Sequence, residues 1–353
     1  MHDARVLVVD DSAAMRALFC DVLEQTKNVL VVGTAANADE ARDQIAELRP
    51  NVVTLDVEMP GMSGIEFLEE IMNTNPLPVV MLSSLTQSGT ETSLKAFELG
   101  AVECFPKPLK ATPEQFQKTV GKLGKIVLAA ANSNLREKPR PRAAKAEGDA
   151  GPDYSPNGKI AAFSTSMGGV DALTEVLGHY PKNCPPTVIV LQTEPALAEM
   201  FIARADKECA CSVKAAADGA ELSAGTVHIV FDPNKHVIVE PGIPAKLRMV
   251  EREPVEGFRP SATLLFGSLS RAGMATIGSV LTGMGEDGAK GLKLLKAAGF
   301  RTLAQDRTTA TVPQAPAAAV EAGAVDAELK LEDLAADVLA NCGTAAVAEA
   351  VAS

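Results

Sequence analysis

The stretch Ile160–Asp171, with the sequence IAAFSTSMGGVD, decides the fold of the second half of the chain. Its first four residues are apolar and suit a buried strand, and the next six are mostly small and end in two glycines. From Val170 onward, apolar residues recur at helical spacing. This order of strand, turn and helix places Ser166 at the carboxyl end of a strand, where open α/β sheets carry their chemistry.

Ser166 can be interpreted in two ways. A serine exposed on such a turn can act as a nucleophile, and Gly168 and Gly169 would let backbone N–H groups approach a developing negative charge. A serine at this position can also simply cap the helix that follows. The stretch alone leaves both interpretations open.

The composition limits the class of protein. The chain has 353 residues, enough for two domains, and its 46% hydrophobic and 22% charged residues are typical of a globular protein without a membrane-spanning run. A net charge of −12 argues against a general nucleic-acid binder. The six cysteines are scattered, Cys209 and Cys211 lack a second pair at metal-binding spacing, and the first strand follows at once without a signal peptide. We therefore expect reduced thiols and a cytoplasmic location.

The first 124 residues alternate short apolar runs with helical patterns. Strands are predicted over 6–9, 30–33, 52–55, 79–82 and 102–105, and helices over 13–25, 38–48 and 88–99. A loop with the sequence MPGMSG follows the third strand at 59–64. Five strands that alternate with helices predict a parallel, doubly wound α/β sheet of the flavodoxin-like kind.

Polar side chains follow the ends of these strands. Asp10 and Asp11 follow the first strand and Asp56 ends the third, so three carboxylates should meet at one edge of the sheet. Three carboxylates repel one another unless a divalent cation lies among them, and hard oxygen ligands suit Mg²⁺. Asp56 could then attack a phosphoryl group, which Ser83 would hydrogen-bond and Lys107 would pair with.

These residues resemble the receiver domain of bacterial response regulators over residues 4 to about 124. The shared features are Asp-Asp at 10–11, the MPGMSG stretch after Asp56, Ser83, and Lys107 followed by proline. The resemblance implies that a partner histidine kinase phosphorylates Asp56. The Mg²⁺ ligands that it implies are Asp10, Asp11, Asp56 and the backbone of Glu58.

One position departs from the receiver pattern. Receivers usually carry an aromatic switch residue three positions before the lysine, and here that position is Cys104. Phe105 is next in line, but its side chain should point to the opposite face of the strand. The relay that the resemblance implies therefore lacks its usual aromatic residue at this position.

A change in composition separates the halves of the chain. We predict a receiver domain over 1–124, an interdomain linker over 125–157 and a second domain over 158–353. Helical periodicity continues over 125–131 and is then lost in a basic, proline-containing stretch at 136–145. That charged run is interpreted as a solvated linker, with docking to an acidic partner as the alternative.

The second domain is also predicted to be doubly wound α/β. Its predicted strands cover 160–163, 187–191, 227–230, 237–240, 277–281 and 301–304, and its helices 170–177, 196–207, 261–272, 288–298 and 314–322. A terminal helix is expected in the alanine-rich tail, 331–353. No basic helix-turn-helix pattern occurs, which disfavours a transcription factor.

A second informative turn has the sequence LTGMGEDGAKGL, at 281–292. Asp287 lies at the start of a predicted helix, where an aspartate commonly acts as a cap. Because Ser166 ends another strand, Asp287 could instead orient a histidine while the N–H of Met284 stabilises an oxyanion.

Ser166, Asp287 and their turns resemble the catalytic domain of the CheB family of chemotaxis protein-glutamate methylesterases, over about residues 159–330. The most specific shared stretch is VLTGMGEDGAKGL at 280–292, and a receiver in front is the same domain order. The resemblance implies a CheA-type kinase and chemoreceptors as partners, a monomer, and no cofactor in the second domain. It also implies Ser166 as nucleophile, Asp287 as orienting carboxylate and the Met284 N–H in the oxyanion hole.

This chain lacks the general-base histidine of that family. In the family the histidine follows the glutamine that ends the 188–192 stretch, and here the residue is Thr193. A threonine does not hold a proton near neutral pH, so Ser166 lacks a base. Further departures from the family pattern are Met167, Phe258, Thr263 and the stretch QAPAAA at 314–319.

Four histidines could in principle replace the base. His2 belongs to the receiver tail, and His179 is interpreted as a surface residue after a helix. His228 alternates with apolar residues in a strand and suits the core, and His236 matches a family histidine that is not the base. A substituting role for His228 or His236 is the less favoured alternative.

Three functions are compatible with these residues. The favoured one is a CheB-like response regulator, phosphorylated on Asp56, whose second domain is weakly active or inactive as an esterase and acts by binding receptors or kinase. The second is an active methylesterase that releases methanol from glutamyl methyl esters of chemoreceptors. The third is a hydrolase with another substrate. None involves nucleic acid or insertion into a membrane.

Overall fold

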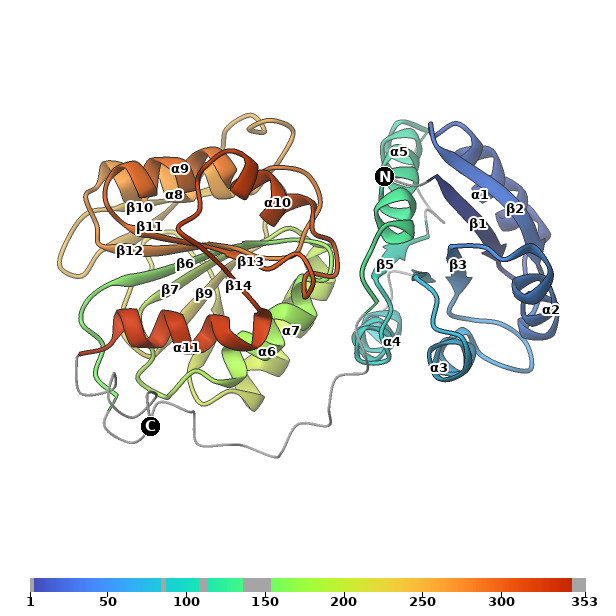
Figure 1. Cartoon of the computed structure of the whole chain (residues 1–353), viewed down its shortest axis with the longest axis horizontal. Helices are drawn as coiled ribbons and strands as arrows, with labels where there is room; N and C mark the ends of the chain where they lie inside the picture. The colour runs from blue at the N-terminus through green and yellow to red at the C-terminus, as the bar shows by residue number, and fades with distance from the viewer. Residues whose placement is uncertain (1–2, 84–86, 108–112, 136–153, 345–353) are drawn as a thin grey trace. The chain divides into compact units, whose positions relative to one another are not determined.

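A computed structural model describes residues 3–83, 87–107, 113–135 and 154–344. The chain divides into two compact units, Met1–Arg140 and Pro141–Ser353, each with its own sheet (Figure 1). The predicted linker boundaries stay predictions, because most of the linker lies outside the described residues. Among the described residues, no helix combines the length and apolarity needed to cross a membrane.

The first unit is a five-stranded parallel sheet in the order β2-β1-β3-β4-β5, which confirms the predicted fold. The strands are β1 (Ala4–Val9), β2 (Val29–Ala35), β3 (Val52–Asp56), β4 (Val79–Ser83) and β5 (Glu103–Pro106). The helices are α1 (Ala13–Glu24), α2 (Ala38–Leu48), α3 (Gly64–Thr74), α4 (Gln87–Glu98) and α5 (Pro113–Ala131). Because the strand order reverses between β1 and β3, a crevice is expected at their carboxyl ends.

Helix α3 was not among the predicted elements. It begins directly after the MPGMSG loop, where Ser63 and Glu66 form a capping box. Ile65, Leu68 and Ile71 bury one face of the helix. At its start, a Cβ on Gly64 would lie 1.8 Å from the carbonyl oxygen of Asp56, so only glycine allows the chain to turn this close to β3.

The second unit is a seven-stranded parallel sheet in the order β14-β13-β12-β6-β7-β9-β8, with a separate antiparallel pair β10-β11. The strands are β6 (Ile160–Thr165), β7 (Thr187–Leu191), β8 (Ser212–Ala215), β9 (Thr226–Val230), β10 (His236–Glu240), β11 (Lys246–Val250), β12 (Thr276–Val280), β13 (Arg301–Gln305) and β14 (Ala327–Leu329). The helices are α6 (Gly169–Gly178), α7 (Pro195–Glu208), α8 (Ala262–Arg271), α9 (Ala289–Ala297), α10 (Gln314–Glu321) and α11 (Leu331–Cys342).

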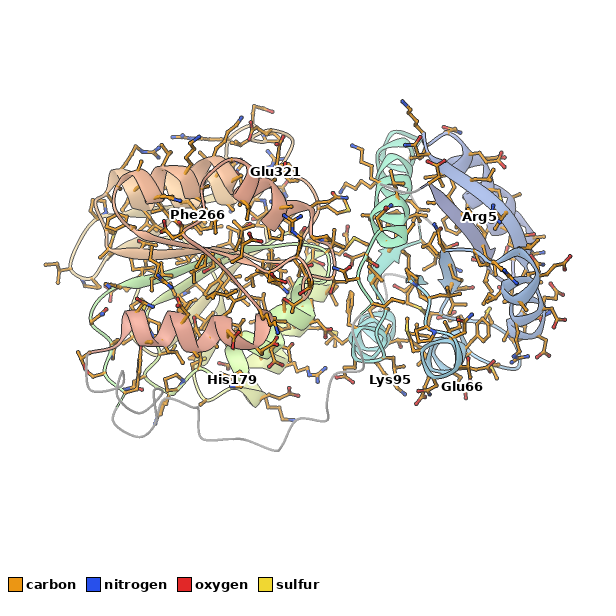
Figure 2. The ribbon with its side chains drawn as sticks, viewed as in Figure 1. Arg5, Glu66, Lys95, His179, Phe266 and Glu321 are labelled. Atoms are coloured by element: carbon orange, nitrogen blue, oxygen red, sulfur yellow. The ribbon has the colours of Figure 1, made fainter. Side chains whose placement is uncertain are left out.

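Helices cover both faces of this sheet, as predicted for a doubly wound domain. Figure 1 shows α8, α9 and α10 on one face and α6, α7 and α11 on the other. Phe266 of α8, labelled in Figure 2, is fully buried in the core with Leu292 and Leu295 of α9. The strands β8, β11 and β14 were not predicted, and the predicted strand 237–240 belongs to the separate pair.

The ends of the second unit are tied to each other. Asn157 donates its N–H to the carbonyl of Cys342 at 2.7 Å, and Thr344 donates to the carbonyl of Ser155. Helix α11 covers the first part of the predicted terminal helix, and residues 345–353 lie outside the described ranges. In the first unit, helix α5 continues to Ala131, as the helical pattern over 125–131 predicts.

The aromatic residues of the second unit provide a selective probe of its unfolding. The chain has no tryptophan and two tyrosines, Tyr154 and Tyr180. Both belong to the second unit and are 2% and 0% exposed. Tyrosine fluorescence therefore reports on unfolding of that unit alone.

Candidate functional site

In the first unit, three carboxylates meet at the carboxyl ends of β1 and β3. Ligand oxygens of Asp10, Asp11 and Asp56 all lie within 4.8 Å of one another. Asp10 and Asp56 are 0% and 3% exposed, whereas Asp11 is open to solvent. The backbone N–H of Glu58 donates to Oδ1 of Asp56 at 3.2 Å. A cluster of hard oxygen ligands with one open side fits Mg²⁺.

Lys107 supplies the positive charge of this cluster. Its Nζ lies 2.8 Å from Oδ2 of Asp10 and 2.7 Å from Oδ1 of Asp56. Burial raises the pKa of Asp56, and the hydrogen bond from Lys107 opposes that rise. A cation held by the three carboxylates would favour the ionised form of Asp56, the form needed for nucleophilic attack.

Ser83 is the last residue of β4, and Lys107 directly follows β5, the strand next to β4 in the sheet. The N–H of Lys107 donates to the carbonyl of Ser83 at 2.8 Å, which fixes the two residues side by side. The Ser83 hydroxyl lies 3.4 Å from the hydroxyl of Ser93 on α4. Cys104 is buried and its thiol donates to the carbonyl of Ser93 at 3.7 Å, so the position expected for an aromatic residue holds a small side chain packed on α4.

In the second unit, Ser166 directly follows β6, as predicted. Its N–H donates to the carbonyl of Thr282, and its Oγ accepts the N–H of Met284 at 3.0 Å. The helix cap that follows is Gly168, in the left-handed conformation and without a side-chain cap bond. The interpretation of Ser166 as a helix cap is therefore wrong.

Glycine allows the two turns to approach each other. A Cβ on Gly283 would lie 2.5 Å from Oγ of Ser166, so a side chain at this position would displace the hydroxyl. Thr282 further joins the turns, because its hydroxyl donates to the carbonyl of Met167 and accepts the N–H of Val312. The Ser166 hydroxyl is thus held at the Met284 N–H, and the role of this N–H as an oxyanion donor stays a prediction.

The Asp287 carboxylate caps α8 and not α9, the helix that begins two residues after it. Its carboxylate accepts the N–H groups of Ala262 at 2.7 Å and Thr263 at 3.2 Å, which open α8. The hydroxyl of Ser261 donates to Oδ1 at 2.7 Å. Helix α9, which Asp287 precedes, has no side-chain cap. Asp287 is 4% exposed, so these bonds compensate for its burial.

Gln192 provides the fourth donor to Asp287. It follows β7, and its Nε2 donates both to Oδ2 of Asp287 and to the carbonyl of Pro260, each at 2.8 Å. A carboxylate offers about four acceptor positions, so those of Asp287 are filled by donors other than an imidazole. Thr193, the next residue, is half-buried. The sequence signal for Gln192 was its place at the end of a strand, beside Thr193.

None of the three histidines that the structure describes is hydrogen-bonded to Ser166. His179 follows α6 with a partly exposed side chain, in line with its interpretation as a surface residue, and its Nε2 lies 3.3 Å from Oε1 of Glu175; Figure 2 labels His179. His228 lies in β9 with Nε2 at 3.3 Å from the carbonyl of Glu221. His2 lies outside the described residues.

His236 is linked to the Asp287 carboxylate through Ser261, which bonds to both residues. Its Nδ1 accepts the N–H of Ser261 at 3.2 Å, and Nε2 lies 3.1 Å from the carbonyl of Glu253. These partners fix the neutral tautomer with the proton on Nε2, and burial lowers the pKa of His236. Both ring nitrogens are therefore occupied away from Ser166.

We expect His236 to make the second unit less stable in acid. Its lowered pKa means that the folded unit takes up a proton less readily than the unfolded chain. Stability is thus fully present above about pH 6.5 and is lost as the pH falls below it. Urea titrations followed by tyrosine fluorescence give the free energy of unfolding at each pH. His236→Gln should reduce the slope of this free energy against pH by at most about 1.4 kcal/mol per pH unit.

The matched control for this experiment is His179→Gln, which removes a partly exposed histidine from the same unit. An equal change in slope for both variants would contradict the role assigned to His236.

The fold and the two sites define a class of protein. A five-stranded parallel sheet that carries an acidic cluster, a serine and a lysine at its strand ends is a response-regulator receiver, here joined to an α/β domain with a serine on a strand-to-helix turn. Residues 6–120 match the family described as response regulator receiver domain, and residues 161–338 match the family described as CheB methylesterase.

Curated relatives share the whole chain. A protein-glutamate methylesterase/protein-glutamine glutaminase of Rhizobium etli is 43% identical and covers 95% of this chain and 96% of its own length. A relative of the same name from Caulobacter vibrioides is 41% identical, covering 96% and 98%. The solved CheB methylesterase catalytic domain of Thermotoga maritima is 27% identical, with a TM-score of 0.50, and covers 52% of this chain and 98% of its own. The chain belongs to the CheB family.

Proposed function

We propose that this chain is a phosphorylation-controlled CheB-family response regulator whose methylesterase domain is weakly active or inactive and acts chiefly by binding. The observation that carries the proposal is the hydrogen bonding of Ser166, whose Oγ accepts the Met284 N–H but lacks a histidine partner among the described residues. A serine hydroxyl without a base to take its proton is a poor nucleophile near neutral pH.

The arrangement around Asp287 supports the same proposal. In a serine triad the carboxylate orients the imidazole and stabilises its charged form. Here Asp287 instead holds the amino end of α8, together with Ser261 and Gln192. With Thr193 after Gln192, the described residues place no imidazole at Ser166, and the acceptor positions of Asp287 are taken by other donors. Loss of the base in a serine hydrolase costs on the order of 10⁴–10⁶ in rate.

The receiver half supports phosphorylation of Asp56. Its carboxylate is buried beside Lys107 and belongs to an acidic cluster that fits Mg²⁺. When bound, the cation would neutralise charge on the incoming phosphoryl group. Asp10, Asp11 and Asp56 would hold the cation, and Ser83 and Lys107 would contact the phosphoryl oxygens. A CheA-type histidine kinase as donor, and chemoreceptors as binding partners of a monomeric protein, complete the proposal.

A second candidate, an active methylesterase, is favoured by one observation. Ser166 lies at the Met284 N–H, so the two groups that this candidate uses as nucleophile and oxyanion donor lie next to each other. In that case Ser166 would attack the glutamyl methyl ester and release methanol, with a water molecule as the proton acceptor.

Methanol release from methylated chemoreceptors separates the two candidates. The wild-type chain and Ser166→Ala should be assayed in parallel with Mg²⁺ and acetyl phosphate as phosphoryl donor, with the Rhizobium etli relative as the positive control. We expect the rates of wild type and Ser166→Ala to agree within about tenfold, since only the base-independent rate remains.

The variant Asp56→Asn, which cannot accept the phosphoryl group, tests whether activation was achieved in that assay. Wild-type turnover near that of the relative, abolished by Ser166→Ala, would refute the proposal and establish the active enzyme.

A further inference from the structure

The carboxyl end of α11 is capped by an asparagine from the segment ahead of β6. Helix α11 ends at Cys342, and the last carbonyls of a helix lack partners within the helix itself. Asn157 donates its backbone N–H to the carbonyl of Cys342 at 2.7 Å. Its side-chain Nδ2 donates to the carbonyl of Asn341 at 3.1 Å and to that of Gly343 at 3.0 Å. One asparagine thus satisfies three successive carbonyls at the end of the helix.

Backbone pairing and an aromatic ring complete this contact. Pro156 forms an antiparallel bridge with Gly343. A Cβ built on Gly343 would lie 2.9 Å from the ring of Tyr154, so the ring packs directly on the backbone, and Tyr154 is buried. We call the paired segments 154–157 and 341–344 the terminal clasp. Opening of the clasp would uncover the Tyr154 ring.

Asn157 is followed by Gly158, and no other asparagine in the sequence precedes a glycine. Because glycine has no side chain, its backbone nitrogen can approach the side-chain carbonyl carbon of the preceding asparagine. Both residues are exposed, and Gly158 has a φ of 85°. The Oδ1 of Asn157 accepts the N–H of Lys159 at 3.1 Å. That N–H would stabilise the negative charge that develops on Oδ1 during an attack on the side-chain amide.

We propose that Asn157 is a deamidation site and that its conversion to aspartate opens the terminal clasp. The backbone nitrogen of Gly158 attacks Cγ of Asn157, and an N–C bond forms. The bond between Cγ and Nδ2 breaks, and ammonia leaves with the proton of the Gly158 N–H. Water then opens the cyclic imide at one of its two carbonyls and restores the N–H, which gives aspartate or isoaspartate. One water molecule is consumed for each ammonia released, and no oxidant is needed.

The product is poorly suited to the position that Asn157 occupies. An ionised carboxylate accepts hydrogen bonds but donates none, so the carbonyls of Asn341 and Gly343 would lose their partner. The new negative charge would also lie at the carboxyl end of α11, where the helix dipole disfavours anions. In isoaspartate the backbone runs through Cγ, which would shift the N–H away from Cys342 as well. The clasp should therefore stay open after conversion.

The closed clasp also slows the reaction. Both the backbone N–H and the side-chain amide of Asn157 are held by α11, so Cγ and the Gly158 nitrogen meet only when the clasp opens locally. We therefore expect Asn157 to be converted in the folded protein, but more slowly than in the same chain unfolded in urea.

Peptide mapping tests the proposal. The full-length protein is incubated at mildly alkaline pH, either folded or unfolded in urea, and is then digested with trypsin. Cleavage after Lys145 and Lys159 releases the segment 146–159, in which Asn157 carries the sole side-chain amide. We expect this peptide to gain the mass that replacement of NH₂ by OH produces, more slowly in the folded sample. The segment 215–235, whose one asparagine precedes a lysine, should stay unchanged.

Urea unfolding followed by tyrosine fluorescence adds a second readout. Asn157→Asp, which creates the product directly, should lower the urea midpoint of the second unit. The matched control Asn234→Asp adds the same charge to an exposed residue of that unit and should leave the midpoint nearly unchanged. Converted wild-type protein, separated on an anion exchanger by its extra negative charge, should show the same lowered midpoint. Two results would each overturn the proposal: equal midpoints for the two variants, or an Asn157 that stays intact in the folded protein while the unfolded chain converts it.

Discussion

The variant Thr193→His is expected to hydrolyse glutamyl methyl esters about 10²–10⁴-fold faster than the wild type, the usual contribution of a well-placed general base. The reason is geometric. Gln192 donates its side-chain amide to Asp287 at 2.8 Å and its backbone N–H to the carbonyl of Thr165, the residue before Ser166, so position 193 directly follows a residue that contacts both turns. The Ser166 hydroxyl is already held at the Met284 N–H, and under the proposed function a base is the part that the variant supplies.

The gain should follow the titration of the new imidazole. Because only its neutral form accepts a proton, the rate of Thr193→His should rise with pH through about 6.5 and then level off. Thr193→Asn is the matched control, since it introduces a polar side chain without a proton acceptor of that kind. Adding Ser166→Ala to Thr193→His should abolish the gain.

A folded Thr193→His protein without any gain would mean that the missing base is not the limiting defect. The occupied acceptor positions of Asp287 identify the next obstacle, because the new imidazole would have to displace the Gln192 amide. Rescue by adding Gln192→Ala to Thr193→His would then be the informative result.

The second large effect concerns stability. Asp287→Ala is expected to destabilise the second unit by about 3–4 kcal/mol, because it removes a buried charged acceptor from several donors at once. The N–H groups of Ala262 and Thr263 and the hydroxyl of Ser261 would lose their partner at the start of α8. Urea unfolding of the full chain, followed by tyrosine fluorescence, measures this loss.

Glu286→Ala is the matched control for this variant. It removes the same charge from the adjacent residue, but Glu286 is exposed, so we expect a change within about 0.5 kcal/mol. A loss below about 1 kcal/mol for Asp287→Ala would show that α8 does not depend on this carboxylate. In that case the capping of α8 would no longer explain why the acceptor positions of Asp287 are filled by donors other than an imidazole.

Much of the fold follows from the sequence because the two large sheets are parallel and covered by helices. Such strands are continuous apolar runs, as in β3, β4 and β7, and their ends are marked by polar residues or glycine. The missed strands are different in kind. The edge strands β8 and β14 have four and three residues, and their burial is incomplete, so the apolar signal is weak. Helix α3 was missed because it directly follows a loop rich in proline and glycine.

The receiver site was predictable because its residues all follow strand ends of one sheet. The carboxylates of Asp10, Asp11 and Asp56 lie together, and Lys107 contacts two of them. In the second unit, the same rule that polar residues gather at strand ends led us to expect Ser166 near Met284, and the two are hydrogen-bonded. It did not predict the partners of Asp287, because a carboxylate that caps a helix some 25 residues away leaves no local pattern.

The capping bonds of Asp287 also bear on how such chains should be classified. A residue that holds a helix in place is under selection for folding even after the chemistry it once served has lapsed. Asp287 can therefore be retained for the start of α8 alone, whether or not the chain hydrolyses an ester. If the proposed function holds, the residue at position 193 tells more about ester hydrolysis by this chain than Asp287 does.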